Sequence, residues 1–294
     1  MNPSDLLPQQ RLVHSVALLA AALLGLGVVM WIAANWQVMG RVGQFALLQG
    51  LVLATGLGAA FLLPARVALG LLCLLGVGAL LAYFGQTYQT GADPWQLFAL
   101  WAALTLPLCW ATRSDVLWAP WALVAATAIA LWAYALGGQR WSTSAAQVPL
   151  HLMAWSASFA LSVGLSPALA RYTGAGLWSF RLAAMLVVMA VATTAIGALL
   201  KSPPAPQYPL GLLVLALGLG VLSVPKWWDV FAASAIVLGV NVLLIAGLVR
   251  WLFDDTSGDW VGRALLIGLV AAGLLAASVS LLMRLSRRSV GAAA

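Results

Sequence analysis

The sequence predicts an all-α integral membrane protein, a polytopic bundle of about ten transmembrane helices. Three observations support this fold class: 64% of the residues are hydrophobic, only 7% are charged, and the mean hydropathy is +1.02. Soluble domains carry about 25% charged residues, so this composition excludes a soluble fold. The apolar residues also form blocks of about 20, the length of a helix that crosses a bilayer, without the alternation of a transmembrane barrel.

Ten apolar segments are expected to cross the membrane within a single domain that covers residues 1–294. A short polar leader, residues 1–11, precedes them, and a short basic tail, residues 284–294, follows them. The first apolar run is too long for a cleavable signal peptide, so we expect it to remain as a span. The expected spans are residues 12–36, 42–63, 65–84, 95–111, 116–136, 148–169, 182–200, 208–224, 227–250 and 260–283.

The arrangement of the spans has two further features. Ten spans fit two halves of five helices, an organisation found in many transporters, although the halves share little sequence here. Tryptophans stand at both ends of the spans, where amphipathic rings anchor at the headgroup level. Examples are Trp36, Trp95, Trp141, Trp251 and Trp260 on one side and Trp110, Trp118, Trp227 and Trp228 on the other.

The distribution of Lys and Arg predicts the orientation. Ten spans place both termini on one side of the membrane, and that side carries nine of the 14 basic residues. Because cytoplasmic loops are enriched in Lys and Arg, we expect both termini in the cytoplasm and the chain in a bacterial inner membrane. The net charge of +7 comes from basic residues scattered singly between apolar blocks. The expected partner is therefore the lipid bilayer, and no nucleic acid is expected.

A polar, turn-forming connector, residues 85–94, stands out between the third and fourth spans. Irregular backbone at membrane depth persists only where it is buried in protein or lines a wet cavity. Together with an asparagine at the outer end of the first span, its side chains predict an outward-facing site for a small polar or cationic ligand. The predicted substrate-binding residues are Asn35, Gln86, Tyr88, Gln89 and Asp93.

The same residue types also have structural interpretations. Asp93 directly before Pro94 is typical of a helix start, with the carboxylate accepting hydrogen bonds from the first free amides. Amides such as Asn241 can hydrogen-bond across helices, each contributing about 1 kcal/mol. His151, in the first turns of the sixth span, is more typical of an interfacial residue than of a metal ligand, since His14 is the only other histidine.

The sequence gives little support for an enzyme, and it leaves open whether the protein is one. The chain contains no glutamate, and no aspartate lies in the middle of a span, which disfavours proton-driven transport. A phosphate-binding loop, the HExxH and GxSxG motifs and paired carboxylates are all missing, so no catalytic residue is predicted. Cys73 and Cys109 are expected to be buried free thiols. No cofactor and no metal site are predicted.

Two motifs resemble a known family. They are an IAANW end to the first span and a GQ-Y-Q-G-DPW-L connector, carried here by Ala33, Ala34, Asn35, Trp36, Gly85, Gln86, Tyr88, Gln89, Gly91, Asp93, Pro94 and Leu97. In these motifs the chain resembles a bacterial family of polytopic predicted membrane proteins of unknown function. The resemblance covers the first four spans and the rest by hydropathy alone. It implies a membrane location and draws attention to the connector, and it implies no reaction.

Three functions remain open. The first is small-molecule transport or binding through the outward-facing polar site. The second is a non-catalytic membrane scaffold or a subunit of an envelope complex, with a membrane-protein partner or as a homo-oligomer, in which the same residues are helix caps and packing contacts. The third, and least favoured, is a membrane-embedded enzyme that acts on lipid-linked substrates.

Overall fold

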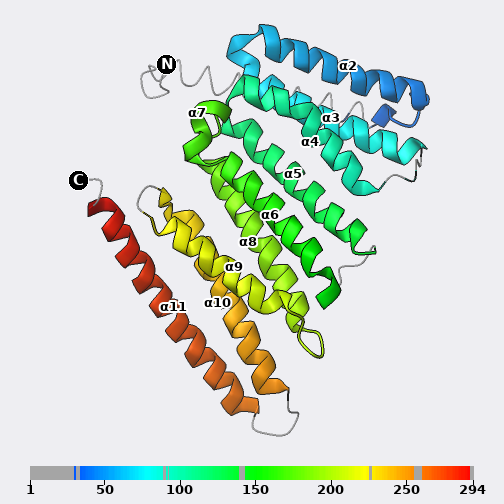
Figure 1. Ribbon diagram of the computed structural model, residues 1–294. Helices are drawn as coiled ribbons and strands as arrows, with labels where there is room; N and C mark the ends of the chain where they lie inside the picture. Colours follow the sequence, from blue (N-terminus) through cyan, green and yellow to red (C-terminus); the bar gives the residue numbers. More distant parts are fainter. Residues whose placement is uncertain are drawn as a thin grey trace. The chain divides into compact units, whose positions relative to one another are not determined.

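The computed structural model describes residues 30, 34–88, 91, 93–138, 143–224, 227–254 and 260–291 (Figure 1). These residues form helices and connectors, with no strand among them. The chain divides into two compact units, residues 1–54 and 55–294, and the boundary falls within helix α2. The expected first span lies for the most part outside the described residues.

The described helices confirm the all-α, multi-pass fold. Seven of them are long and apolar enough to cross a membrane, or eight if a bent pair is taken as one span. Together with the bent pair and the shorter apolar helix Gln207–Leu222, they make nine helices among the described residues, which coincide with the second to tenth expected spans. Their bounds are α2 (Gly40–Phe61), α3 (Arg66–Tyr88), α4 (Pro94–Thr112), α5 (Asp115–Leu136), α6 (Val148–Gly164), α8 (Leu177–Leu199), α9 (Gln207–Leu222), α10 (Val230–Phe253) and α11 (Trp260–Gly291).

The sixth expected span, residues 148–169, is wrong as a single straight helix. Helix α6 ends at Gly164, and the chain bends by 54° before the short helix α7 (Ala170–Thr173). Pro167 causes the break, because a proline disfavours the helical conformation in the residue before it. Ser166 has accordingly an extended backbone, with φ −68° and ψ 154°.

Indole N–H groups join neighbouring helices in the first part of the larger unit. Trp101 on α4 donates to the Leu74 carbonyl on α3 at 2.8 Å. Trp118 on α5 donates to the Thr173 carbonyl on α7 at 3.1 Å. The expectation that Trp118 anchors at the headgroup level is therefore wrong, since its side chain is 2% exposed and packs in the protein core. Cys109 lies in the same core, and both cysteines are buried free thiols as predicted.

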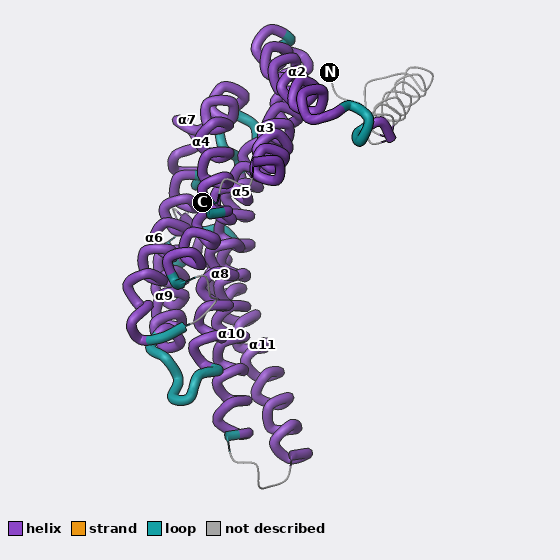
Figure 2. The backbone as a smooth tube through the Cα atoms, turned by 90° about the vertical axis from the view of Figure 1, so that its right-hand side faces the viewer, coloured by secondary structure: helices purple, strands orange, loops and turns teal. Residues whose placement is uncertain are grey.

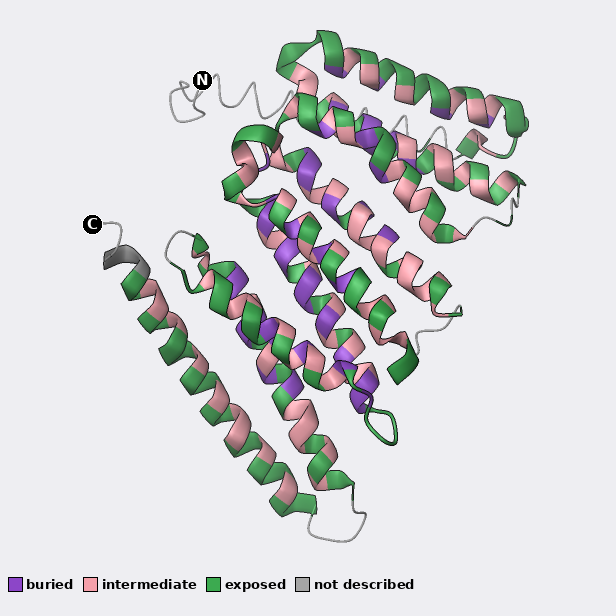
Figure 3. Ribbon diagram, viewed as in Figure 1, coloured by how far each residue is buried: buried purple, intermediate pink, exposed green. Residues whose placement is uncertain are grey.

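Helix α8 is the central element of the larger unit, and it packs against α5, α6, α9 and α10. Figure 3 shows buried residues along most of its length. Val187 and Val191 of α8 pack with Leu215 of α9 and with Ile236 and Leu243 of α10. Small and β-branched side chains suit this position, because helices in a bilayer are held together by close packing rather than by exclusion from water.

Helix α11 lies beside α10 in both views of the backbone (Figures 1 and 2). A pair of polar side chains joins the two helices. The Asn241 amide nitrogen donates to the Ser278 hydroxyl at 2.8 Å, and that hydroxyl lies 3.2 Å from the Asn241 amide oxygen. Asn241 is buried. The structural interpretation of this asparagine, a hydrogen bond across helices, is thus confirmed.

The carboxylate of Asp115 joins the start of α5 to the start of α8. Its Oδ1 accepts hydrogen bonds from the Gly176 amide at 2.8 Å and the Ser179 hydroxyl at 2.6 Å, and its Oδ2 accepts from the Trp178 amide at 3.1 Å. A negative charge is favoured at these free amides of a helix N-terminus. A Cβ on Gly176 would lie 2.3 Å from Oδ2, so this contact requires glycine at position 176.

Replacing Asp115 by Ala is expected to lower the free energy of unfolding by about 2 kcal/mol, because it removes several charge-assisted hydrogen bonds and leaves helix amides without an acceptor. Reversible unfolding in mixed micelles measures the change. Asp254→Ala is the matched control, since Asp254 is an exposed carboxylate beyond the end of α10. Equal losses in the two variants would contradict the assignment.

Candidate functional site

Gln86 and Tyr88 lie on the last turn of α3 rather than in an irregular connector. The helix continues past the expected end at Phe84 and stops at Tyr88. The rings of Phe84 and Tyr88, one turn apart, have centroids 4.9 Å apart, a contact that favours the extra turn. Gln86 and Tyr88 are both exposed. Gln89 lies outside the described residues.

Asp93 begins helix α4, as its place before Pro94 predicts. Its backbone is extended, Pro94 is the first helical residue, and the Asp93 carbonyl accepts a hydrogen bond from the Gln96 amide at 3.0 Å. Its carboxylate makes no capping hydrogen bond, so the expected bonds from the free amides to this side chain are wrong. The helix start is thus formed without the carboxylate, and a ligand-binding role for Asp93 stays a prediction.

Asn35 belongs to the unit of residues 1–54, whereas the connector, residues 85–94, belongs to the other unit. Its carbonyl accepts hydrogen bonds from the amides of Val38 and Met39, at 3.1 and 3.2 Å, in the turn before α2. The site that combines Asn35 with the connector therefore stays a prediction.

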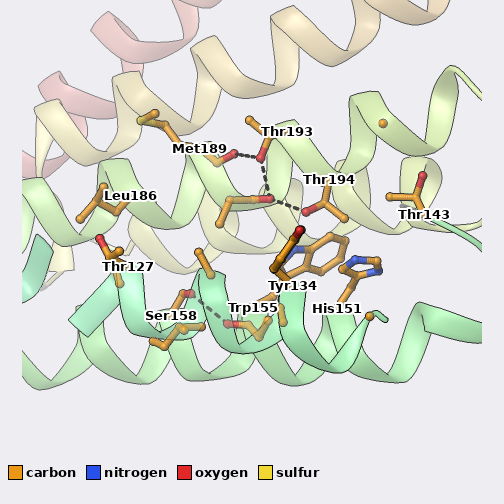
Figure 4. A pocket seen from close by; sticks show the side chains of 18 of the residues that line it. Thr127, Tyr134, Thr143, His151, Trp155, Ser158, Leu186, Met189, Thr193 and Thr194 are labelled. Carbon is orange, nitrogen blue, oxygen red and sulfur yellow. Dashed lines mark hydrogen bonds between the residues drawn. The ribbon is translucent and has the colours of Figure 1, made fainter. Parts of the chain in front are cut away.

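A cavity of about 470 Å³ lies among α5, α6 and α8 (Figure 4). Neither Gln86 nor Asp93 belongs to its lining. Most of the wall is apolar, and the described lining residues carry no charge. Hydroxyl groups and one imidazole interrupt the apolar wall, from Thr127, Tyr134, Thr143, His151, Ser158, Thr193 and Thr194.

Thr143, one of the lining residues, has a buried side-chain oxygen without a hydrogen-bond partner among the described residues. The residue is 7% exposed, and its Oγ1 has no partner among the described residues. Thr143 packs against α8. A Cβ built on Gly197 of that helix would lie 3.5 Å from the methyl carbon of Thr143. Buried polar atoms are hydrogen-bonded in the great majority of cases, so this unpaired oxygen is an energetic cost to the fold.

His151 meets Gln207, the first residue of α9, at the edge of the cavity. Gln207 is fully buried; its amide nitrogen donates to the Ser144 carbonyl and lies 3.3 Å from His151 Nδ1. The imidazole of His151 also hydrogen-bonds to the backbone of Gln147, so groups from two segments hold it at the start of α6. The Gln207 oxygen, Oε1, has no partner among the described residues and is a second unused acceptor.

Four of the other lining hydroxyls, including that of Thr127, direct their protons to their own helices. Thr193 and Thr194 donate to carbonyls one turn earlier on α8, at 2.7 and 2.8 Å, and Ser158 does the same on α6 at 2.9 Å. Figure 4 shows these bonds as dashed lines. A hydroxyl bound in this way keeps lone pairs that can accept. These hydroxyls therefore present hydrogen-bond acceptors within an apolar wall.

Sequence reasoning did not find this cavity, because its polar residues come from three helices. His151 is identifiable by its type but has no nearby partner in the sequence. The signal that could have been used is the pair Thr193 and Thr194, two adjacent hydroxyls within the apolar segment 182–200. Such a pair marks a helix face that packs in the protein or lines a cavity, and it does not identify the other walls.

The helices and the cavity define a multi-pass membrane protein built from apolar helices. Its N-terminal part, residues 2–118, matches a family described as "Predicted membrane protein (DUF2157)", whose function is unknown. This match confirms the resemblance drawn from the motifs around Asn35 and Asp93. No curated protein and no solved structure matches the chain. The matched part contains the connector, whereas the residues that line the cavity lie between positions 123 and 197.

Thr143→Val replaces the unpartnered hydroxyl by a methyl group of nearly the same shape. The free energy of unfolding of the ligand-free protein is expected to rise by about 1 kcal/mol, because a desolvated and unpaired oxygen is removed. Chemical unfolding measures the change. Thr105→Val is the matched control, since Thr105 is also buried but donates to the Trp101 carbonyl at 2.7 Å. A loss of stability in Thr143→Val as large as in Thr105→Val would contradict the assignment.

Proposed function

We propose that the protein binds or transports a small molecule, which it holds in the cavity among α5, α6 and α8. The observation that carries the proposal is a cavity of about 470 Å³ among three helices, whose apolar wall carries hydroxyl groups and one imidazole.

The size and composition of the cavity support a ligand site. Pockets for small molecules are typically about 300–1,000 Å³, with mostly apolar walls and a few placed polar groups. Here the apolar wall includes Leu123 and Leu186, and the polar groups include Tyr134 and His151. A bundle that serves only as a scaffold gains by closing such a space, because interior packing is dense in most proteins.

The predicted topology relates this cavity to the connector. With both termini in the cytoplasm of a bacterial inner membrane, the ends of α3 and α5 and the starts of α4 and α6 all lie on the outer side. The predicted ligand groups Gln86 and Asp93 and the polar cavity residues Thr143 and His151 then share that side. An outward-facing polar site is therefore retained as the proposal, with the cavity as its principal binding space.

A thermal-shift screen of the purified protein against metabolite and lipid libraries tests the proposal. A ligand at 100 times its Kd is expected to stabilise the wild type by about 2.7 kcal/mol. Ala190→Phe, which fills the cavity from α8, should abolish this gain. Ala160→Phe is the matched control, because Ala160 is exposed on α6 and does not line the cavity.

Two other outcomes of the screen would point to a different binding site or to a different function. Stabilisation that survives Ala190→Phe and disappears in Asp93→Asn would place the ligand at the connector. No stabilisation of the wild type across broad libraries would favour the alternative, a non-catalytic scaffold or a subunit of an envelope complex.

A further inference from the structure

We infer that the protein binds the headgroup of an anionic phospholipid at Arg113 and Arg171, at the end of the bundle where α5 and α8 begin. This inference goes beyond the proposed function and does not depend on the cavity. Three features carry it: the way the fold holds Arg113, the charge balance at this end of the bundle, and the exposed aromatic rings beside the two arginines.

Arg113 has a backbone conformation that arginine rarely adopts. It is the C-cap of α4, with φ 50° and ψ 46°, in the left-handed region. A helix usually ends in this conformation with glycine, because a Cβ is disfavoured there. Arg113 is the one residue other than glycine with a positive φ in the described part of the chain. Strained backbone of this kind gathers at functional sites, which indicates a use for the arginine side chain itself.

The segment around α7 is shaped to hold the Arg113 side chain. Gly174, the residue after α7, has a φ of 70°, and a Cβ on it would collide with the Cβ and Cγ of Arg113. The Arg113 Nη2 donates to the Arg171 carbonyl at 2.7 Å, which fixes the guanidinium against α7. A guanidinium has five N–H donors, so this single bond leaves most of them available to an anion.

The positive charge at this end of the bundle is only partly balanced. The Asp115 carboxylate is held by the amides that open α8, and Asp229 at the start of α10 pairs with Arg181 at 2.9 Å. Neither Arg113 nor Arg171 has a carboxylate partner within the described ranges, and both are exposed. The fold therefore brings together two arginines whose counter-charge must come from outside the described chain.

The two arginines lie at a membrane surface. Arg113 stands in the short turn between α4 and α5, both of which are long and apolar enough to cross a bilayer. The Arg171 guanidinium carbon lies 4.4 Å from the centroid of the Tyr172 ring. Tyr172 and Trp178 are 61% and 67% exposed. Exposed rings of this kind anchor at the headgroup level, so the arginines are at the depth of the lipid phosphates.

A lipid fits this surface better than a free anion does. The planar guanidinium binds phosphate oxygens in pairs, and basic groups at the ends of spanning helices attract acidic headgroups. Val116 and Leu177, which are exposed on the first turns of α5 and α8, add apolar surface for acyl chains. A soluble phosphate would use the arginines and leave this apolar surface uncovered.

Native mass spectrometry of the full-length protein in detergent tests the inference. The protein is titrated with phosphatidylglycerol or with phosphatidylcholine that carries the same chains. We expect the first phosphatidylglycerol to bind about 25-fold more tightly, since each of two arginines near a membrane surface contributes about fivefold. Arg171→Gln should lower the affinity for phosphatidylglycerol about fivefold and leave that for phosphatidylcholine unchanged.

The variants separate a binding role from a structural one. The Arg171 side chain donates no hydrogen bond to the described residues and contacts only the Tyr172 ring, so the fold does not depend on it. Arg250→Gln is the matched control, because Arg250 is in the last turn of α10, at the other end of the bundle. Its replacement should not change the affinity for the first phosphatidylglycerol.

Three results would overturn the inference. Two of them are equal affinities for the two lipids, and a loss in Arg250→Gln as large as in Arg171→Gln. The third comes from glycerophosphoglycerol, the same headgroup without acyl chains. If this soluble compound displaces phosphatidylglycerol at a comparable concentration, the arginines bind a free phosphate diester and the lipid assignment fails.

Discussion

The Asp115 carboxylate is the contact on which the cavity depends. It holds the first residue of α5 against the amides that open α8, so the two helices run in the same direction from one fixed end. Helix α6 returns in the opposite direction and packs against both. The space is left between the later parts of α5 and α8, far from the Asp115 contact. Gly176 is part of the same contact, because any Cβ at this position would collide with the carboxylate.

Polar side chains are rare in this chain, and several of those described in the larger unit join neighbouring helices. Lipid tails are as apolar as leucine, so the hydrophobic effect does not hold helices together within a bilayer, and hydrogen bonds help to fix which helices are neighbours. The bonds between neighbours are Trp101–Leu74, Trp121–Ala102, Arg181–Asp229, Tyr208–Leu243 and Asn241–Ser278. The buried Thr143 hydroxyl makes no such bond, since it has no partner among the described residues.

Hydropathy predicted the helices because spanning length is set by the bilayer rather than by tertiary contacts. It failed at helix ends, where local chemistry decides: the Phe84–Tyr88 ring contact lengthens α3, and Pro167 shortens α6. The cavity could not be predicted from the sequence for another reason. Its walls are set by a contact between Asp115 and Gly176, 61 positions apart, and neither segment identifies the other in the sequence. The connector, residues 85–94, could be recognised in the sequence because its polar residues lie close together along the chain.

Helix α9 has 16 residues, a length of about 24 Å, whereas the hydrocarbon core of a bilayer is about 30 Å thick. A short apolar helix of this kind is accommodated by local thinning of the bilayer or by flanking residues that reach the interface. Its first residue, Gln207, is the one that meets His151, and the preceding segment, 201–206, contains the exposed Lys201. Local thinning at this end would bring the aqueous phase close to His151 at the edge of the cavity.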